Sequence, residues 1–200
     1  MTRQNPHYDC SLLLFISLYI LSIQGVRAGE LIHVFTEHEK GIYTIDVEME
    51  IDGDIELIRE LLLDFGKLSH YNENMTSAKL LYSTGPDSNV GRIEIKDCLL
   101  FFCLTLVQVQ ETRRLPSGNI ETRILPEQSD FHKGESLWQF IATKEGKLRI
   151  RIHAVMAPKI YVPPVFGPII ISSKLKKRII NMIKELEILA LANGLAEENR

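Results

Sequence analysis

Two cysteines enclose a short apolar segment near the middle of the chain and could form a covalent bond. Cys98 and Cys103 are separated by the four residues LLFF. On one straight strand they would face opposite sides and lie too far apart to bond, so a disulfide requires the chain to reverse between them. A bonded pair would then hold LLFF, including Phe101 and Phe102, as an apolar hairpin tip. In the alternative, these four side chains fill the core beside two unpaired, buried cysteines.

The other polar residues do not form a known catalytic motif. His70, Tyr71 and His132 fall near predicted loops, but a histidine without a positioned partner is weak support for catalysis. Ser129, Asp130 and His132 are the residue types of a catalytic triad, yet they are too close in sequence to assume triad geometry. The chain has no P-loop, no G-x-G-x-x-G, no H-E-x-x-H and no cysteine–histidine cluster. We therefore expect no catalytic set, no metal and no cofactor.

The first 28 residues have the three-part pattern of a secretory signal. A polar start precedes the apolar run of residues 11–23, and small residues precede a cut between Ala28 and Gly29. The run is short for a membrane span, which needs about 20 apolar residues. We expect a signal peptide over 1–28 and an exported protein, periplasmic or secreted; the alternative is an N-terminal membrane anchor. Export into an oxidising compartment favours the disulfide over free thiols.

Length, composition and charge are those of one ordinary globular domain. The chain has 200 residues, of which 45% are hydrophobic and 24% are charged. Its formal net charge of -3 argues against a nucleic-acid partner, because nucleic-acid-binding domains are usually basic.

The longest predicted element is a helix over residues 168–192, which Asn193-Gly194 should end. Apolar residues recur along it at helical spacing, from Ile171 to Leu189, so one wide face must pack against a large apolar surface. The basic residues of the helix lie mainly off that face: Lys174, Lys176, Lys177, Arg178 and Lys184.

Most of the preceding chain alternates between apolar and polar residues, which is typical of half-buried strands. One strand is predicted at 41–52, then a short helix at 55–65 and a second short helix or turn at 67–74, while 29–38 is a lead-in. Six further strands are predicted at 77–83, 90–97, 99–112, 120–125, 135–143 and 147–156. Consecutive hairpins give an antiparallel sheet, and the predicted class is α+β. Arg149, Arg151 and His153 should lie on the solvent-exposed outer face.

This order of elements resembles the START-like, or SRPBCC, superfamily, which includes polyketide cyclase/dehydrase-like and coenzyme-Q-binding START proteins. The resemblance covers residues 39–192 and is greatest to secreted bacterial members of unassigned function. Three segments carry it: CLLFFC at 98–103, SDFHKG at 129–134 and VPPVFGP at 162–168. It implies a helix-grip fold, in which about seven curved antiparallel strands surround the C-terminal helix and two short helices follow the first strand.

The resemblance also implies an apolar cavity between the sheet and the C-terminal helix, used for lipids, sterols, quinones or polyketides. Loops 98–103, 125–135 and 157–168 would surround its mouth. The candidate lining residues, each of which could instead be plain core, are Phe101, Phe102, Trp138, Phe140, Ile150, Ile152 and Phe166. Candidate polar groups at its edge are His70, Tyr71 and His132. Basic residues near the mouth could contact anionic head groups or form a solvated helix face: Lys174, Lys176, Lys177 and Arg178.

Three functions remain open at this point. We favour binding, shielding or transport of a hydrophobic small molecule such as a lipid or quinone, with transient membrane contact. The second is a cyclase/dehydrase-like enzyme, which requires a titratable group with a perturbed pKa inside the cavity. The third is a protein-interaction module, which predicts a filled core.

Overall fold

The computed structural model describes residues 29–70, 74–99, 102–162 and 167–198. The predicted signal peptide, Tyr71, Phe101 and Phe166 lie outside these ranges, and Phe102 is described in its backbone alone. The predictions made for these residues therefore stay predictions.

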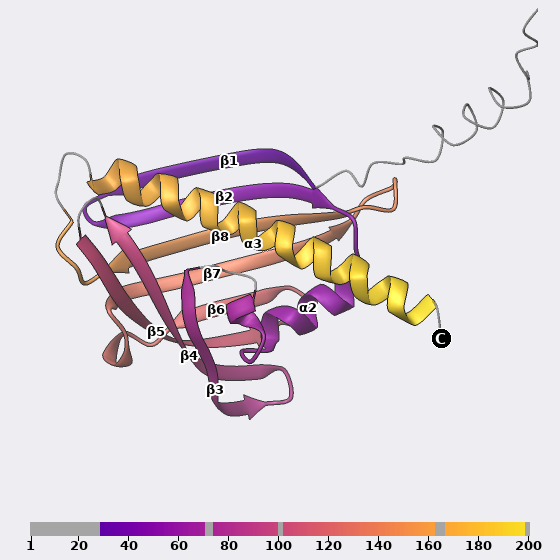
Figure 1. Cartoon of the computed structure of the whole chain (residues 1–200), viewed down its shortest axis with the longest axis horizontal. Coiled ribbons are helices and arrows are strands. Elements are labelled where there is room, and N and C mark those ends of the chain that lie inside the picture. The colour runs from indigo at the N-terminus through magenta and orange to yellow at the C-terminus, as the bar shows by residue number, and fades with distance from the viewer. Residues whose placement is uncertain (1–28, 71–73, 100–101, 163–166, 199–200) are drawn as a thin grey trace, which may run out of the picture.

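Within the described ranges, eight strands form one antiparallel sheet in the order β1-β2-β8-β7-β6-β5-β4-β3 (Figure 1). Each strand pairs antiparallel with its neighbours, so β1 and β3 form the two edges. The strands are β1 Glu30–Glu39, β2 Ile42–Ile51, β3 Met75–Gly85, β4 Ser88–Leu99, β5 Phe102–Arg114, β6 Ile120–Ile124, β7 Phe131–Ala142 and β8 Leu148–Pro158.

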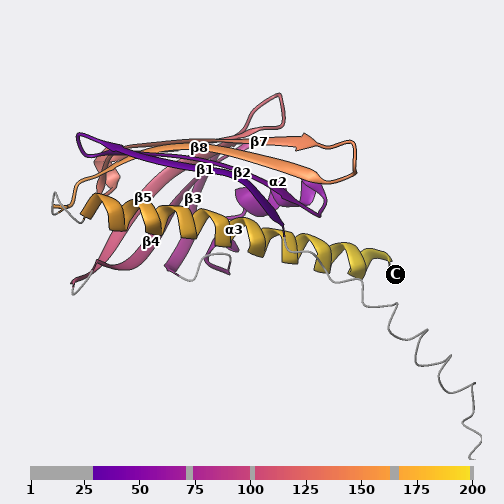
Figure 2. The same cartoon turned by 90° about the horizontal axis from the view of Figure 1, so that it is seen from above.

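The long helix α3, Gly167–Glu198, lies across one face of the sheet, and strands β3 to β5 bend around it (Figures 1 and 2). A shorter helix, α2 (Ile55–Leu63), follows β2 on the same side and begins at Asp54, whose side chain accepts a hydrogen bond from Leu57 N at 2.8 Å. Two 3-10 turns complete the description, η1 (Leu68–His70) and η2 (Pro126–Gln128). The predicted α+β helix-grip architecture is confirmed.

The lead-in predicted at 29–38 is wrong, because these residues form an eighth strand, β1. Its side chains are mostly exposed, so apolar alternation could not reveal it. The strand is instead fixed by backbone pairing with β2 across a two-residue turn. In this turn Lys40 and Gly41 have φ values of 50° and 82°, the left-handed conformation of a tight hairpin turn.

The predicted end of the long helix is also wrong. α3 continues through Asn193 and Gly194 to Glu198. Both residues are permitted in a left-handed cap, but neither requires one, and the four residues that follow, LAEE, are good helix formers.

Strands β2 and β8 show how alternation divides the sheet into a core face and a solvent face. The five apolar residues of β2 from Tyr43 to Ile51 are buried, as is Ile150 opposite them on β8. On the outer face, Arg149 Nε donates to Glu50 Oε1 at 2.9 Å and Arg151 Nε lies 3.0 Å from Glu48 Oε2. The outer placement predicted for the basic residues of β8 is confirmed.

Candidate functional site

A cavity of about 180 Å³, here called the large pocket, lies between the sheet and α3. Its walls are mainly apolar, with Ile93, Trp138 and Ile152 from the sheet and Leu175 and Ile179 from the helix. These side chains face the interior because alternate residues of a strand point to the same face of the sheet, and residues three or four apart lie on the same side of a helix. The helix therefore covers the sheet without filling the space beneath it.

A second cavity of about 80 Å³, here called the small pocket, adjoins the large pocket near the start of α3. Both pockets are bordered by Ile95, Gln108, Met156, Leu175 and Arg178. A ligand that passed between these shared side chains would occupy both pockets.

A polar stripe interrupts the apolar wall of the large pocket. Gln108, Gln110 and Thr112 occupy alternate positions of β5 and so share one face of the strand. The Gln108 amide donates to Gln110, whose Nε2 donates to Thr112 Oγ1 at 3.0 Å. Thr112 Oγ1 lies 3.5 Å from Thr122 Oγ1 on β6. The stripe is thus uncharged and largely satisfied by its own members, and a ligand could exchange hydrogen bonds with it.

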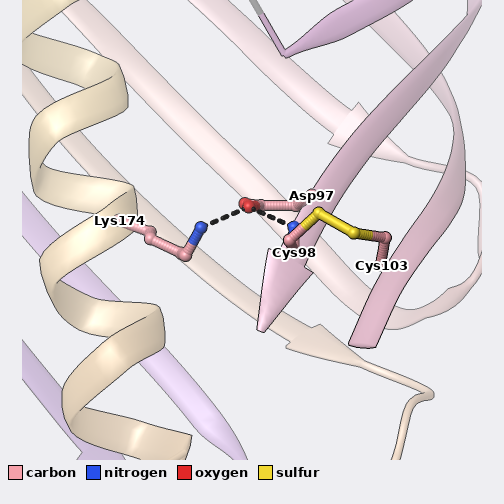
Figure 3. Close-up of a disulfide and its surroundings, with 4 residues drawn as sticks. All are labelled: Asp97, Cys98, Cys103 and Lys174. Carbon is pink, nitrogen blue, oxygen red and sulfur yellow. Dashed lines mark hydrogen bonds and ion pairs between the residues drawn. A yellow bond between two sulfur atoms is a disulfide. The ribbon is translucent and has the colours of Figure 1, made fainter. Parts of the chain in front are cut away.

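A charged cluster borders the small pocket where α3 meets the end of β4. Arg178 Nη2 donates to Asp97 Oδ2 at 2.6 Å. Figure 3 shows the second contact, in which Lys174 Nζ donates to Asp97 Oδ1. Two cations thus share one carboxylate. Burial lowers the pKa of the Arg178 guanidinium, and the attraction and hydrogen bond of Asp97 oppose this effect.

Tyr43 on β2 borders the small pocket as well, and burial raises the pKa of its phenol. The Tyr43 hydroxyl and Arg178 Nε are buried and have no hydrogen-bond partner among the described residues. The small pocket therefore combines a charged cluster with two residues that each carry an unused donor.

The predicted disulfide between Cys98 and Cys103 is confirmed. The two residues pair directly across β4 and β5, with their Cα atoms 3.9 Å apart, so the chain reverses between them. Asp97 precedes the bond, and its Oδ1 accepts from Cys98 N at 2.8 Å as well as from Lys174 (Figure 3). The covalent link thus closes the hairpin beside the carboxylate of the charged cluster.

The candidate lining residues divide between the pocket wall and the core. Trp138 and Ile152 border the large pocket. Phe140 and Ile150 are buried but border neither pocket. The Arg59 guanidinium lies over the Phe140 ring, 5.3 Å from its centroid, which accounts for that aromatic position.

The histidines predicted at the cavity edge lie elsewhere. His70 and His132 are exposed and border neither pocket. On β7 it is Phe131, next to His132, that faces the small pocket, so strand alternation turns the histidine outward.

Ser129 and Asp130 bond to the backbone of β5 rather than forming a catalytic set. Ser129 Oγ accepts from Val109 N at 2.8 Å, and Asp130 Oδ2 accepts from Val107 N at 2.7 Å. Both side chains thereby satisfy backbone N–H groups in the part of β5 that extends past the end of β6 and has no β6 partner.

The four basic residues predicted near the cavity mouth separate into two pairs on α3. Lys174 and Arg178 turn toward Asp97, and the Arg178 side chain is only 17% exposed. Lys176 and Lys177 are exposed on the helix surface. Lys174 and Arg178 are four residues apart and therefore lie on the same side of the helix. The sequence shows this spacing, but it indicates a charged cluster only when the position of Asp97 is known.

No group of metal-binding side chains is found among the described residues. The helices in the described part of the chain include none that is long and apolar enough to span a membrane.

Comparison with known proteins identifies the fold. No protein-family model matches the chain, and no curated protein matches it. Among solved structures, a START superfamily protein from Mycobacterium smegmatis has a TM-score of 0.59 and 16% identity, covering 74% of this chain and 97% of that one. A STAR-related lipid transfer protein from Xanthomonas axonopodis has a TM-score of 0.56 and 10% identity, covering 78% and 98%.

The Zhui aromatase/cyclase from Streptomyces sp. R1128 is also similar, with a TM-score of 0.55 and 11% identity over 72% of this chain and 92% of that one. At such low identity the likeness is one of fold. The chain therefore has the START-like, or SRPBCC-type, helix-grip fold.

Proposed function

We propose that the protein binds a hydrophobic small molecule, such as a lipid or quinone, in the large pocket and shields or carries it. The observation that carries this proposal is the mainly apolar space that α3 leaves open against the sheet. Burial of apolar surface in such a site contributes about 25 cal/mol per Å². The similarity in fold to a STAR-related lipid transfer protein supports the same assignment.

A cyclase-like enzyme is supported less well. Such an enzyme needs a group poised to move a proton near neutral pH. The raised pKa of Tyr43 leaves the phenol protonated, and arginine does not give up its proton in proteins, so neither residue is a ready base. Both oxygens of Asp97 are already engaged by cations. The protein-interaction alternative predicts a filled core, and the two pockets argue against it.

A pair of matched substitutions tests the binding proposal. Ala154 borders the large pocket on β8, whereas Ala142 is exposed at the end of β7. Ala154→Phe should fill the pocket and weaken binding of a fluorescent hydrophobic probe at least about tenfold, while Ala142→Phe should leave it unchanged. Native mass spectrometry of the protein from its own host should show a co-purifying lipid. Unaltered probe binding by folded Ala154→Phe, or no binding at all by the parent protein, would overturn the proposal.

We also propose that the protein is exported, with residues 1–28 removed. The disulfide supports this, since such bonds persist mainly in oxidising compartments. Determination of the N-terminal residue in protein from its own cells tests it. Gly29 at the terminus supports export, whereas a retained leader together with free thiols contradicts it.

Transient membrane contact is proposed for the exposed pair Lys176 and Lys177. Each charge near an anionic bilayer surface contributes about 1 kcal/mol. Replacement of both lysines by glutamine should reduce flotation of the protein with anionic vesicles, and equal flotation would exclude this surface.

A further inference from the structure

We infer that the ligand is an amphiphile with an anionic oxygen head group, such as a carboxylate, which lies in the small pocket while the apolar tail lies in the large pocket. This inference rests on the proposed function and specifies the chemical class of the ligand. Four features of the structure lead to it.

The first feature is an excess of positive charge. Lys174 and Arg178 both donate to Asp97, so the cluster contains two cations and one anion. The Arg178 side chain is 17% exposed and the Lys174 side chain 37%. Charge that is partly withdrawn from water is costly unless an opposite charge compensates it. One bound anion would balance the cluster.

The second feature is a pair of unused donors. Arg178 Nε and the Tyr43 hydroxyl are buried without a hydrogen-bond partner among the described residues, and both residues border the small pocket. A carboxylate has two oxygens and can accept from several donors at once. Hydrogen bonds of this kind, in which one partner is ionised, are stronger than neutral ones.

The third feature is that, apart from Gln108, the rest of the small pocket is apolar. Leu104 and Leu106 from β5, Ile160 after β8 and Ile171 from α3 border it. A small inorganic anion would gain nothing from these side chains. An amphiphile would, because its first methylene groups would lie among them.

The fourth feature is that the two pockets are adjacent and share bordering side chains. Arg178 borders both, together with Leu175 from the preceding turn of α3. A head group at Arg178 therefore lies beside both pockets, and we place the attached chain in the large pocket, along Leu175 and Ile179 toward Trp138.

The test compares three ligands with the same ten-carbon tail: decanoate, decan-1-ol and decyltrimethylammonium. Each displaces a fluorescent hydrophobic probe from the disulfide-bonded protein. Decanoate should bind about tenfold or more tightly than decan-1-ol, since it gains charge-assisted hydrogen bonds. The cation should bind weakest. Acetate and phosphate, which lack the tail, should not compete.

Four substitutions assign the preference to the cluster. Arg178→Gln should reduce the affinity for decanoate about tenfold and leave that for decan-1-ol nearly unchanged. Asp97→Asn should shift decanoate affinity in the opposite direction, because it removes the competing carboxylate. Tyr43→Phe is nearly isosteric and should preserve the fold, while the affinity for decanoate should fall several-fold. Lys184→Gln, an exposed position on the same helix, should change nothing.

The outcomes separate the two proposals. If none of the three amphiphiles binds, the proposed function itself fails. If decan-1-ol binds as tightly as decanoate, the proposed function stands and the anionic head group is excluded. The same conclusion follows if Arg178→Gln and Tyr43→Phe change the affinities for decanoate and decan-1-ol equally. If acetate competes as well as decanoate, the cluster is a site for free anions, which also overturns the inference.

Discussion

Glu187 is a buried carboxylate on α3 that holds the start of the sheet against the helix. It is 3% exposed, and its Oε2 accepts from Gly29 N at 2.7 Å while its Oε1 accepts from Asp52 N at 2.9 Å. One side chain thus satisfies backbone donors at the beginning of β1 and just after β2. If the chain is cut after Ala28 as proposed, Gly29 N becomes an α-ammonium group, and the hydrogen bond becomes a partly buried ion pair.

The cost of Glu187→Gln should therefore depend on the N-terminus. In a chain that keeps residues before Gly29, the substitution leaves one backbone donor unsatisfied and should lower the free energy of unfolding by about 1–3 kcal/mol. In a chain that begins at Gly29 it leaves a half-buried terminal ammonium group without its charged partner, and the loss should be about 1–2 kcal/mol greater. Urea denaturation of both chains measures the difference, with exposed Glu185→Gln as the control. Equal losses of unfolding free energy in the two chains would mean that the terminal charge does not interact with Glu187.

Single residues of the site differ in how far the sequence could identify them. Trp138 and Ile152 were predictable, because strand alternation alone points them inward. The link between Asp97 and Arg178 was not, because it joins residues 81 positions apart and depends on how far along the sheet α3 lies. Gln108 and its neighbours show a period of two that was visible, but polar residues at that period are ordinarily assigned to the solvent face.

At the scale of elements, the β4–β5 hairpin is the segment that the disulfide controls. The bond joins residues five apart in sequence, so it closes a very short loop. On the chain-entropy account, a loop this short stabilises the fold by only about 2 kcal/mol. The larger effect should be local, since Asp97 accepts from Cys98 N and depends on the conformation of that strand end.

The double substitution Cys98→Ser with Cys103→Ser should separate these two effects. We expect the free energy of unfolding in urea to fall by about 2 kcal/mol, with the same fold retained by circular dichroism. Binding of decanoate should strengthen slightly relative to binding of decan-1-ol, because a less well fixed Asp97 competes less for Lys174 and Arg178. Reduced parent protein is the matched control and should behave like the variant. Loss of the entire fold would contradict a local role for the bond.

The elements themselves were predictable where one face is buried and the other is solvated. Strand β2 meets that condition along its length and β8 from Leu148 to Ala154, which explains why their faces were assigned correctly. Edge strand β1 does not, since neither face is buried; its signal lay in the two-residue turn at Lys40-Gly41 instead. The prediction of where α3 ends failed for another reason. Asn193-Gly194 can adopt the left-handed cap conformation, but such a pair ends a helix only where the chain must turn.

At the scale of the whole molecule, the space under α3 limits what the protein can hold. Pockets for drug-sized ligands usually measure about 300–1,000 Å³. The large and small pockets, at about 180 and 80 Å³, are below that range. A short-chain ligand fits this arrangement, whereas a long-chain lipid requires α3 to move away from the sheet. Ile183 and Leu186 are fully buried and oppose such a movement in the second half of the helix. We therefore expect any movement of α3 away from the sheet to occur in its first half, near the small pocket.

A chain-length series measures this limit. Each methylene group buried should contribute about 0.8 kcal/mol, or roughly a fourfold gain in affinity, for as long as the pocket has room. For linear alcohols from hexanol upward we expect that slope at first, and then a plateau before hexadecanol, where further carbons remain in water. Displacement of a fluorescent probe gives each affinity, and Ala154→Phe should move the plateau to a shorter chain because it occupies part of the large pocket. A slope that continues undiminished to hexadecanol would show that α3 opens to admit longer chains, and the closed pocket would then be the resting state of a larger one.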